Sequence, residues 1–277
     1  MINLFYITNN ISEAQIVDNL DIDWIFIDLE KIGKKERQVG RNTLFSDHSI
    51  TDIEKIKNKI HNTKIIVRCN PIGEWSEKEF NELNARDSEI DMVILPYFKT
   101  KEEVNIFINL LDTRKIEPAL LVETLDAITN LDEIIKIFPF RYLHLGLNDL
   151  HIERGTLSMF EPYVDGTLTK ISSILKRNNQ DFGIGGIGRI GANMSPSPEC
   201  ILTEHIRLKS NGVILSRSFK GNFLEKNKDF FRKELSHAVD DLRSYEKMAN
   251  NLSNYQLTKN LKKMKKEMEV IKKNEKI

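Results

Sequence analysis

Two carboxylates follow apolar runs that are typical of buried strands. Glu123 ends the run in "LLVETLDAI" (120–128), and Asp149 follows the run in "LHLGLNDL" (143–150). Like charges that lie close together repel and raise each other's pKa unless a positive partner lies between them. A divalent ion supplies this charge, and Mg²⁺ or Mn²⁺ prefers carboxylate, water and substrate oxygens as ligands. We therefore expect Glu123 and Asp149 to be metal ligands.

Further polar residues end the apolar runs that precede these two. Asp28 and Glu30 close one run, and Arg68 closes the next. An arginine is always protonated and offers a fixed fork of donors, so with a Lewis-acid metal it can hold a 2-oxo acid and stabilise its enolate. The alternative is local, because Glu123 and Asp149 each precede helix-like or turn segments, where a carboxylate can serve as a helix N-cap.

Eight short apolar runs alternate with amphipathic segments, and these elements must position the polar residues. Several runs are apolar at consecutive positions, as in parallel strands that are buried on both faces. The number and order of the runs predict an α/β fold of the (β/α)8 TIM-barrel class, whose sites lie at the carboxyl ends of the strands. A doubly wound open sheet is the alternative. The expected strands cover residues 3–7, 23–28, 64–69, 91–95, 117–122, 141–146, 182–187 and 212–216.

Helices are expected between these strands. Residues 49–60 and 124–135 have apolar residues at helical spacing, and the segment 100–111 opens with a Thr cap followed by Glu103 at the capping-box position. We expect the barrel to comprise residues 1–222.

Residues 223–277 are predicted to form C-terminal helices, a helical extension that helps the chain to oligomerise. From about residue 225 this segment has neither glycine nor proline. Its apolar residues recur at the spacing of an a/d seam, at Leu257, Leu261, Met264, Met268 and Ile271. Such a seam can pack on the chain's own barrel or on a partner subunit.

Composition narrows the class of protein. Lys+Arg and Asp+Glu both number 41, so no overall basic field indicates a nucleic-acid partner. The two cysteines, Cys69 and Cys200, form neither a disulfide framework nor a metal-type spacing. The start of the chain lacks the pattern of a signal peptide, and no apolar run approaches the roughly 18 residues of a membrane span. We expect a cytoplasmic protein with no membrane partner.

At the residues of the expected site, the sequence resembles the HpcH/HpaI aldolase and citrate lyase β-subunit family. The likeness spans roughly residues 20–220, in the correct order. The matching pieces are "DIDWIFIDLE" (21–30), "IVRCN" (66–70), "DMVILPYFKTKEEV" (91–104), "LLVETLDAITNLDEI" (120–134), "YLHLGLNDL" (142–150) and "SNGVILSRSF" (210–219).

The resemblance implies a phosphoenolpyruvate/pyruvate-type barrel, often oligomeric, that uses Mg²⁺ or Mn²⁺. By the family motif, Glu123 matches the first metal ligand and Asp149 the second. Arg68 matches the arginine that contacts the keto oxygen and the developing enolate. The backbone N–H groups of Asn148 and Asp149 match those that hold the substrate carboxylate.

This chain departs from the family pattern at the position of the general base. Asp28 and Glu30 match an acidic pair on the second strand, which we expect to serve catalysis and substrate binding, respectively. Pyruvate aldolases of the family continue this pair with a histidine, where this chain has Lys31. The citrate lyase-like branch lacks this histidine and has a lysine where this chain has Tyr97. His48, from the loop 41–50, is the candidate to replace the missing base, since its ordinary pKa suits acid–base work, and the alternative is a surface residue near a helix start.

Other candidates are weaker. The glycine-rich run 183–191 lacks the pattern of a dinucleotide site, and it can offer N–H groups to an anion or simply turn the chain. Lys31 and Lys99 lie beyond the strands, so a Schiff-base lysine is disfavoured. His144 is expected on the helix-facing side of its strand, and His151 near the metal ligands.

These observations predict a carbon–carbon lyase, a class II, metal-dependent aldolase that forms or uses the enolate of pyruvate or another 2-oxo acid. Its partners would be this 2-oxo acid and an aldehyde, in a homo-oligomer. Two alternatives stay open. One is a citrate lyase-like enzyme that acts on an acyl-CoA thioester, and the other is a non-catalytic barrel that serves as an interaction module.

Overall fold

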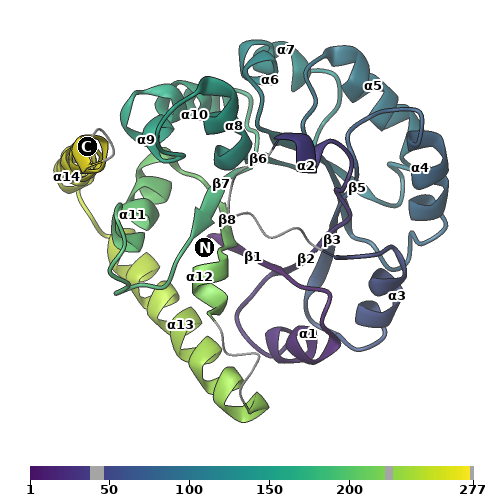
Figure 1. Cartoon of the computed structure of the whole chain (residues 1–277), viewed down its shortest axis with the longest axis horizontal. Helices are drawn as coiled ribbons and strands as arrows, with labels where there is room; N and C mark the ends of the chain where they lie inside the picture. The colour runs from purple at the N-terminus through teal and green to yellow at the C-terminus, as the bar shows by residue number, and fades with distance from the viewer. Residues whose placement is uncertain (38–46, 222–226, 275–277) are drawn as a thin grey trace.

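Eight parallel strands close into a barrel in sequence order, with β1 paired to both β2 and β8 (Figure 1). The computed structural model describes residues 1–37, 47–221 and 227–274, without the side chains of 35, 36 and 270–274. The expected (β/α)8 barrel is confirmed. The strands are β1 (Asn3–Ile7), β2 (Trp24–Asp28), β3 (Lys64–Arg68), β4 (Met92–Leu95), β5 (Glu117–Val122), β6 (Tyr142–Leu145), β7 (Phe182–Ile187) and β8 (Gly212–Leu215).

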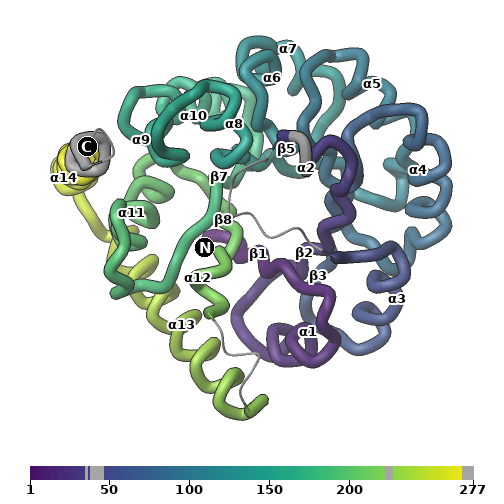
Figure 2. Tube along the Cα trace, viewed as in Figure 1, coloured from purple at the N-terminus to yellow at the C-terminus, as the bar shows by residue number. Residues whose placement is uncertain are grey.

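Helices surround the barrel on its outer side, and Figure 2 shows the chain winding around the strands in one direction. They are α1 (Ile11–Val17), α2 (Lys34–Arg37), α3 (Thr51–Lys57), α4 (Ser76–Asn84), α5 (Lys101–Leu110), α6 (Leu125–Thr129), α7 (Leu131–Ile134), α8 (Leu147–Arg154), α9 (Glu161–Val164), α10 (Thr167–Arg177), α11 (Pro198–Leu208), α12 (Arg217–Lys220), α13 (Lys228–Ala249) and α14 (Asn254–Asn274). The short helix α2 differs from the others because it lies over the barrel opening, near the labels of β5 and β6 in Figure 1.

Side chains that alternate along each strand form two apolar cores. Residues such as Phe5, Phe26 and Ile66 fill the barrel interior, whereas their neighbours in sequence pack against the surrounding helices. Because strand residues alternate between faces, Asp28 and Arg68 continue the inward-facing sets of β2 and β3. The barrel register places these two residues directly side by side. The fold therefore delivers their charged groups to the mouth of the barrel.

His144 lies in the barrel interior, so the expectation that it faces the helices was wrong. Its ring packs edge-on against Phe5, and its Nδ1 lies 2.9 Å from the Tyr142 hydroxyl. Its Nε2 lies 3.0 Å from the Gly185 carbonyl. These large rings leave no room on β7, where a Cβ at Gly183 would fall 1.8 Å from the Tyr142 hydroxyl. The glycines of β7 thus accommodate the aromatic interior of the barrel.

The N-caps of α6 and α8 show whether Glu123 and Asp149 are helix caps, the alternative to a role as metal ligands. Thr124, not Glu123, caps α6, because its side chain accepts the Ala127 N–H. Helix α8 has Gly146 as its N-cap, so Asp149 lies in the first turn rather than at the cap. The N-cap interpretation of both carboxylates is therefore wrong. By contrast, the capping box of Thr100 and Glu103 at the start of α5 is confirmed.

The C-terminal helices pack on the chain's own barrel. Helix α13 contributes Leu235, Val239 and Leu242 to the outer core, and its Glu246 accepts the backbone N–H of Ile2 at 2.6 Å. Arg243 donates to the carbonyl of the same Ile2 at 2.6 Å. The beginning of β1 is therefore held by a helix more than 200 residues further along the chain.

Helix α14 places its seam against the barrel wall. Leu257, Met264 and Met268 are buried, and α14 contacts α11 and α9. In Figure 1 it lies outside these two helices and is viewed along its axis. Of the two expected partners for the seam, the structure shows the chain's own barrel at these three residues. The division of the chain at residue 222 and the role in oligomerisation stay predictions.

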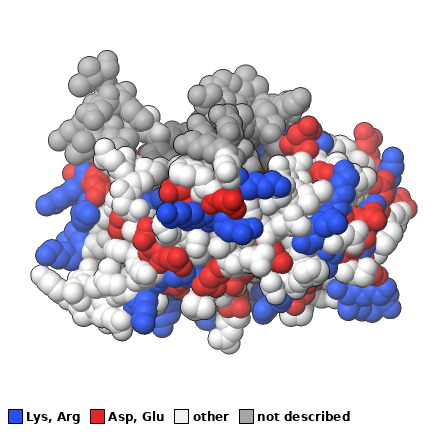
Figure 3. All heavy atoms as spheres, turned by 90° about the horizontal axis from the view of Figure 1, so that it is seen from below, with Lys and Arg blue, Asp and Glu red and all other residues white. Residues whose placement is uncertain are grey.

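The surface carries both signs of charge. On the face seen in Figure 3, Lys and Arg side chains alternate with Asp and Glu side chains, and neither sign forms a continuous patch among the coloured atoms. Within the described ranges, no helix is long and apolar enough to cross a membrane.

Candidate active site

An ion pair between Asp28 and Arg68 lies at the mouth of the barrel. Arg68 donates from Nε to Oδ1 at 2.8 Å and from Nη2 to Oδ2 at 2.7 Å, and Lys34 donates to the same Oδ2 at 2.9 Å. Burial alone would raise the pKa of Asp28, but the charge and hydrogen bonds of Arg68, followed by those of Lys34, hold it well below its usual range. Asp28 is therefore a permanent carboxylate that fixes the Arg68 guanidinium.

Glu30 is surrounded by cations. Its Oε1 accepts from Arg37, and its Oε2 lies 3.2 Å from the Lys34 ammonium and 3.3 Å from Arg68 Nη1. Burial opposes the charge of Arg68, yet Asp28 and then Glu30 raise the pKa of this arginine well above its ordinary value. Arg68 therefore keeps its charge at any working pH.

Glu123 follows the end of β5 and lies near two other carboxylates, those of Asp149 and Glu30. Its side chain is buried, and its Oε1 accepts the Tyr97 backbone N–H at 3.1 Å. Burial, followed by the charges of Asp149 and Glu30, raises the pKa of Glu123 well above its usual range, despite the opposing charges of Arg68 and Arg37. An additional cation beside Glu123 would stabilise its ionised form.

Asp149 and Asn148 form the first turn of α8, on the side of the mouth opposite β2. Asp149 is buried, and its Oδ2 lies 3.7 Å from Arg37 Nη2. The Asn148 side-chain amide donates to Asp149 Oδ1 at 3.4 Å. The N–H groups in the first turn of a helix have no acceptor within the helix, and such groups can bind an anion.

Three of these carboxylates meet the geometry of a cation site. Glu30, Glu123 and Asp149 each bring a carboxylate oxygen within 4.8 Å of the others, and all three are buried. Hard divalent ions prefer such oxygen ligands. Glu30 also pairs with Lys34, Arg37 and Arg68. The donor set therefore fits Mg²⁺ or Mn²⁺.

His48 lies next to Asp28, where β1 no longer pairs with β2. Its Nδ1 accepts the Asp28 backbone N–H at 2.9 Å, so the neutral ring carries its proton on Nε2. Burial lowers the pKa of His48 in spite of the nearby Asp28 and Asp52 charges. In this arrangement the ring offers a donor at Nε2 and no free lone pair.

Two cations of the site were missed in the sequence. Lys34 and Arg37 come from α2, a helix of four residues with no periodic pattern to reveal it. The only feature of the sequence that could have indicated them is the group of basic residues that follows Asp28 and Glu30. Lys31, by contrast, is exposed, and its backbone N–H binds the Asn70 side chain at 2.8 Å.

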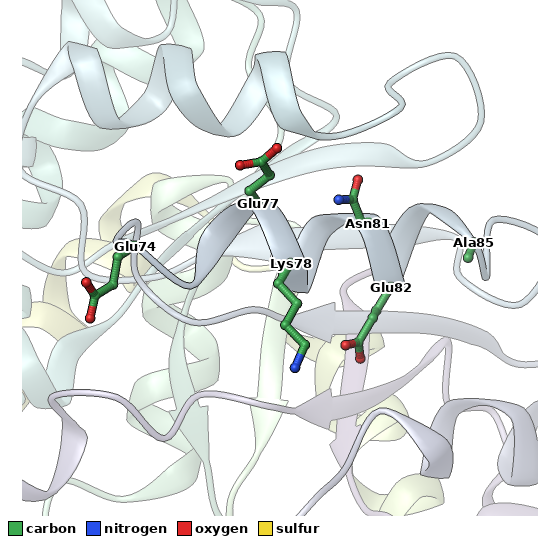
Figure 4. Close-up of a pocket in the computed structure, with 6 residues that line it drawn as sticks. All are labelled: Glu74, Glu77, Lys78, Asn81, Glu82 and Ala85. Carbon is green, nitrogen blue, oxygen red and sulfur yellow. The ribbon is translucent and has the colours of Figure 1, made fainter.

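One surface hollow, of about 340 Å³, includes His48, Lys31 and Asn70 in its lining, whereas another lies away from the site. This second hollow, of about 510 Å³, runs along α4 and is lined by Glu74, Glu77, Lys78, Asn81, Glu82 and Ala85. Figure 4 shows Glu77 and Asn81 pointing away from Lys78 and Glu82, so these side chains do not converge on one point. None of them belongs to the acidic cluster.

The fold and the mouth define a lyase-type barrel, with carboxylates and an arginine at the carboxyl ends of its strands. The family model described as HpcH/HpaI aldolase/citrate lyase matches residues 1–162. This match covers more than half of the chain, which therefore belongs to that family. A comparison with curated proteins gives no match.

Several solved structures share the fold of this chain. An HpcH/HpaI aldolase/citrate lyase family protein from Burkholderia cenocepacia J2315 has a TM-score of 0.60 at 13% identity, over 84% of this chain and 93% of that one. An HpcH/HpaI aldolase from Desulfitobacterium hafniense DCB-2 has a TM-score of 0.57 at 12% identity, over 78% and 86%. The citrate synthase SbnG has a TM-score of 0.57 at 11% identity, over 88% and 93%. At these identities the likeness establishes the fold alone.

Proposed function

We propose that this barrel is a metal-dependent carbon–carbon lyase that forms or uses the enolate of pyruvate or another 2-oxo acid. The observation that carries the proposal is the buried pair Glu123 and Asp149 beside a fixed Arg68. These residues combine an acidic cation site with a permanent positive charge. Enolate chemistry needs both, because negative charge develops on the keto oxygen of the substrate.

Glu123 and Asp149 would hold Mg²⁺ or Mn²⁺. When bound, the ion supplies a Lewis acid that polarises the carbonyl of the substrate. The raised pKa of Glu123 supports this assignment, since burial and two neighbouring carboxylates disfavour its charge until a cation joins them.

Arg68 stabilises the keto oxygen as it becomes an enolate oxygen. Asp28 fixes the guanidinium through two hydrogen bonds, which leaves further N–H donors for the substrate. Such a pre-oriented donor needs no rearrangement when the charge develops. The substrate carboxylate binds to the backbone N–H groups of Asn148 and Asp149 in the first turn of α8.

His48 enters the proposal as the group that moves the proton. With Nδ1 bound to the Asp28 N–H, the neutral ring has its proton on Nε2 and no lone pair to take up another, so it must turn away from this N–H before it can transfer protons. The freed Nδ1 takes the hydroxyl proton of the substrate in cleavage, the imidazolium so formed gives a proton to the enolate carbon, and addition runs the same steps in reverse.

Proton NMR of pyruvate in D₂O tests the proposal without a choice of aldehyde. We expect methyl-proton exchange that requires catalytic Mg²⁺ or Mn²⁺, because exchange uses only the enolate half of the reaction. Glu123→Ala and Arg68→Ala should each reduce it by at least about a hundredfold. Arg177→Gln, on the outer surface, serves as the matched control.

A purified protein that exchanges no methyl protons with either metal would refute the proposal. Activity on an acyl-CoA thioester would then identify the citrate lyase-like alternative. An interaction module would show neither activity, and Glu123→Ala would not affect its role.

A further inference from the structure

The chain turns between Glu30 and α2, just beyond the end of β2. The side chain of Glu30 is buried in the mouth, and Lys34, four residues later, returns to lie 3.2 Å from the same carboxylate. Gly33, within the turn, has a φ of +71°, which glycine adopts without the steric cost of a side chain. The path of this turn therefore decides where Glu30 and the cations of α2 lie.

Side-chain burial contributes little to the position of this turn. The side chain of Lys31 is exposed, and that of Ile32 is only half-buried. Backbone N–H groups, by contrast, are strong donors that folded proteins pair with acceptors. The position of the turn therefore depends mainly on the acceptors of its two N–H groups.

Asn70 supplies both of these acceptors with one atom. Its Oδ1 accepts the backbone N–H of Lys31 at 2.8 Å and that of Ile32 at 3.1 Å. Just before the turn, the N–H of Leu29 donates to the carbonyl of Arg68 at 2.9 Å, as in the pairing of β2 with β3. The Asn70 side chain thus continues the connection between these two segments beyond the ends of the strands.

Glu79, on α4, orients the Asn70 amide. Its Oε1 accepts the Asn70 backbone N–H at 3.1 Å and the side-chain Nδ2 at 2.9 Å. Because the amide nitrogen donates to this carboxylate, the amide oxygen faces the turn. The carboxylate of Glu79 and the two N–H groups of the turn therefore bind opposite ends of one side chain.

The helix that follows the turn carries two cations of the mouth. Lys34 donates to Asp28 at 2.9 Å, and Arg37 binds Glu30. The same Arg37 lies 3.7 Å from Asp149 Oδ2. Since the energy of a charge pair depends on distance, a shift of the turn would alter how these cations compensate the carboxylates.

Resting on the proposed function, we infer that Asn70 is a positioning residue of the lyase reaction. Its side chain fixes the turn that places Glu30 and the cations of α2 around the enolate site. Asn70 acts through the backbone of the turn. A misplacement of about 1 Å in groups that surround a reaction can reduce turnover about a hundredfold.

Asn70→Ala tests this role because it removes the acceptor of the turn. At saturating pyruvate and Mn²⁺, we expect kcat for methyl-proton exchange to fall about 10- to 100-fold. Hydrogen–deuterium exchange, measured by mass spectrometry on a peptide that contains Lys31 and Ile32, should become faster in this variant. Urea denaturation of each variant shows that it is folded under the conditions of the assay.

A double variant, Asn70→Asp with Glu79→Gln, should restore the contact. The introduced carboxylate still accepts the two N–H groups of the turn. The introduced amide donates to that carboxylate, so donor and acceptor are exchanged between the two side chains. We expect kcat to stay within about threefold of the wild type.

Asn84→Ala is the matched control. Asn84, the last residue of α4, also connects two backbone groups, since its Nδ2 donates to the Leu110 carbonyl at 2.8 Å and its Oδ1 accepts the Asp112 N–H at 2.9 Å. These contacts precede β5, at the end of the barrel opposite the mouth. Asn84→Ala should lower the free energy of unfolding about as much as Asn70→Ala and leave kcat unchanged.

The outcomes separate this inference from the proposed function. In a wild type that exchanges methyl protons, an unchanged kcat in Asn70→Ala would overturn the role of Asn70. Equal losses of kcat in the two alanine variants, or no recovery in the double variant, would overturn it as well. A wild type that exchanges no methyl protons would overturn the proposed function, and the inference with it.

Discussion

At the scale of single residues, the mouth depends on how cations and carboxylates are paired. Asp28, Glu30 and Arg68 could be selected from the sequence because each ends an apolar run. Lys34 and Arg37 could not, since α2 has no strand or helix pattern and only tertiary contacts bring it over the mouth. Cations contributed by an irregular segment are thus the part of a site that sequence periodicity misses.

Arg37 should weaken metal binding through repulsion between like charges. We expect Arg37→Gln to bind Mn²⁺ roughly three- to tenfold more tightly than the wild type, because a positive charge beside Asp149 is removed. Electron paramagnetic resonance of free Mn²⁺ measures this directly. Arg37→Lys keeps the charge and should resemble the wild type. Weaker binding in the glutamine variant would contradict the assignment of Asp149 as a ligand.

Replacing Asp28 by a neutral residue should lower the stability of the protein. In Asp28→Asn the buried Arg68 and Lys34 lose a shared counter-charge, so we expect a loss of about 3–5 kcal/mol in the free energy of unfolding. Denaturation by urea measures it. The exposed pair of Asp112 and Arg114 has a similar two-bond geometry and offers a matched control. Asp112→Asn should change stability little, and equal effects would refute the importance of burial.

At the scale of elements, the sequence predicts the positions of the strands but not how their side chains pack in the barrel interior. All eight expected strands are present, because buried parallel strands are continuously apolar. The expected helix at 124–135 divides into α6 and α7 at Asn130, where the helical backbone ends. The side on which His144 lies could not be predicted, since alternation carries no signal when both faces of a strand are buried.

The glycines of β7 give a test of this packing. A Cβ at Gly183 would lie 1.8 Å from the Tyr142 hydroxyl and 2.6 Å from the Gly212 carbonyl, so Gly183→Ala should cost about 3 kcal/mol or more. At Gly186 the nearest atom is 3.3 Å away, and Gly186→Ala should cost less. Thermal denaturation of both variants measures the difference. Similar costs would mean that the barrel interior adjusts freely.

At the scale of the whole molecule, two buried histidines make stability depend on pH. Burial lowers the pKa of His144 to about 4 and that of His205 to about 3, against about 6.5 in an unfolded chain. Between these values the unfolded chain binds protons that the folded chain does not. The free energy of unfolding therefore falls as pH decreases from about 6.5 to about 4.

His205→Gln isolates one of these contributions. It removes a buried titrating group that lies 2.9 Å from the Ser210 hydroxyl. We expect the pH dependence of stability to become less steep by up to about 1.4 kcal/mol per pH unit in this window. Urea denaturation between pH 4.5 and 7.5 gives both slopes. Identical slopes would show that His205 has the same pKa in the folded and the unfolded chain.

The contacts between Ile2 and α13 also set the order in which the protein can fold during synthesis. The first strand leaves the ribosome early, but its neighbour β8 and the residues that hold its start, Arg243 and Glu246, are made late. Until then, β1 presents an open edge of hydrogen-bonding groups. In a nascent chain this edge of β1 therefore stays open until β8 has emerged, and the start of β1 is held only after α13 has followed.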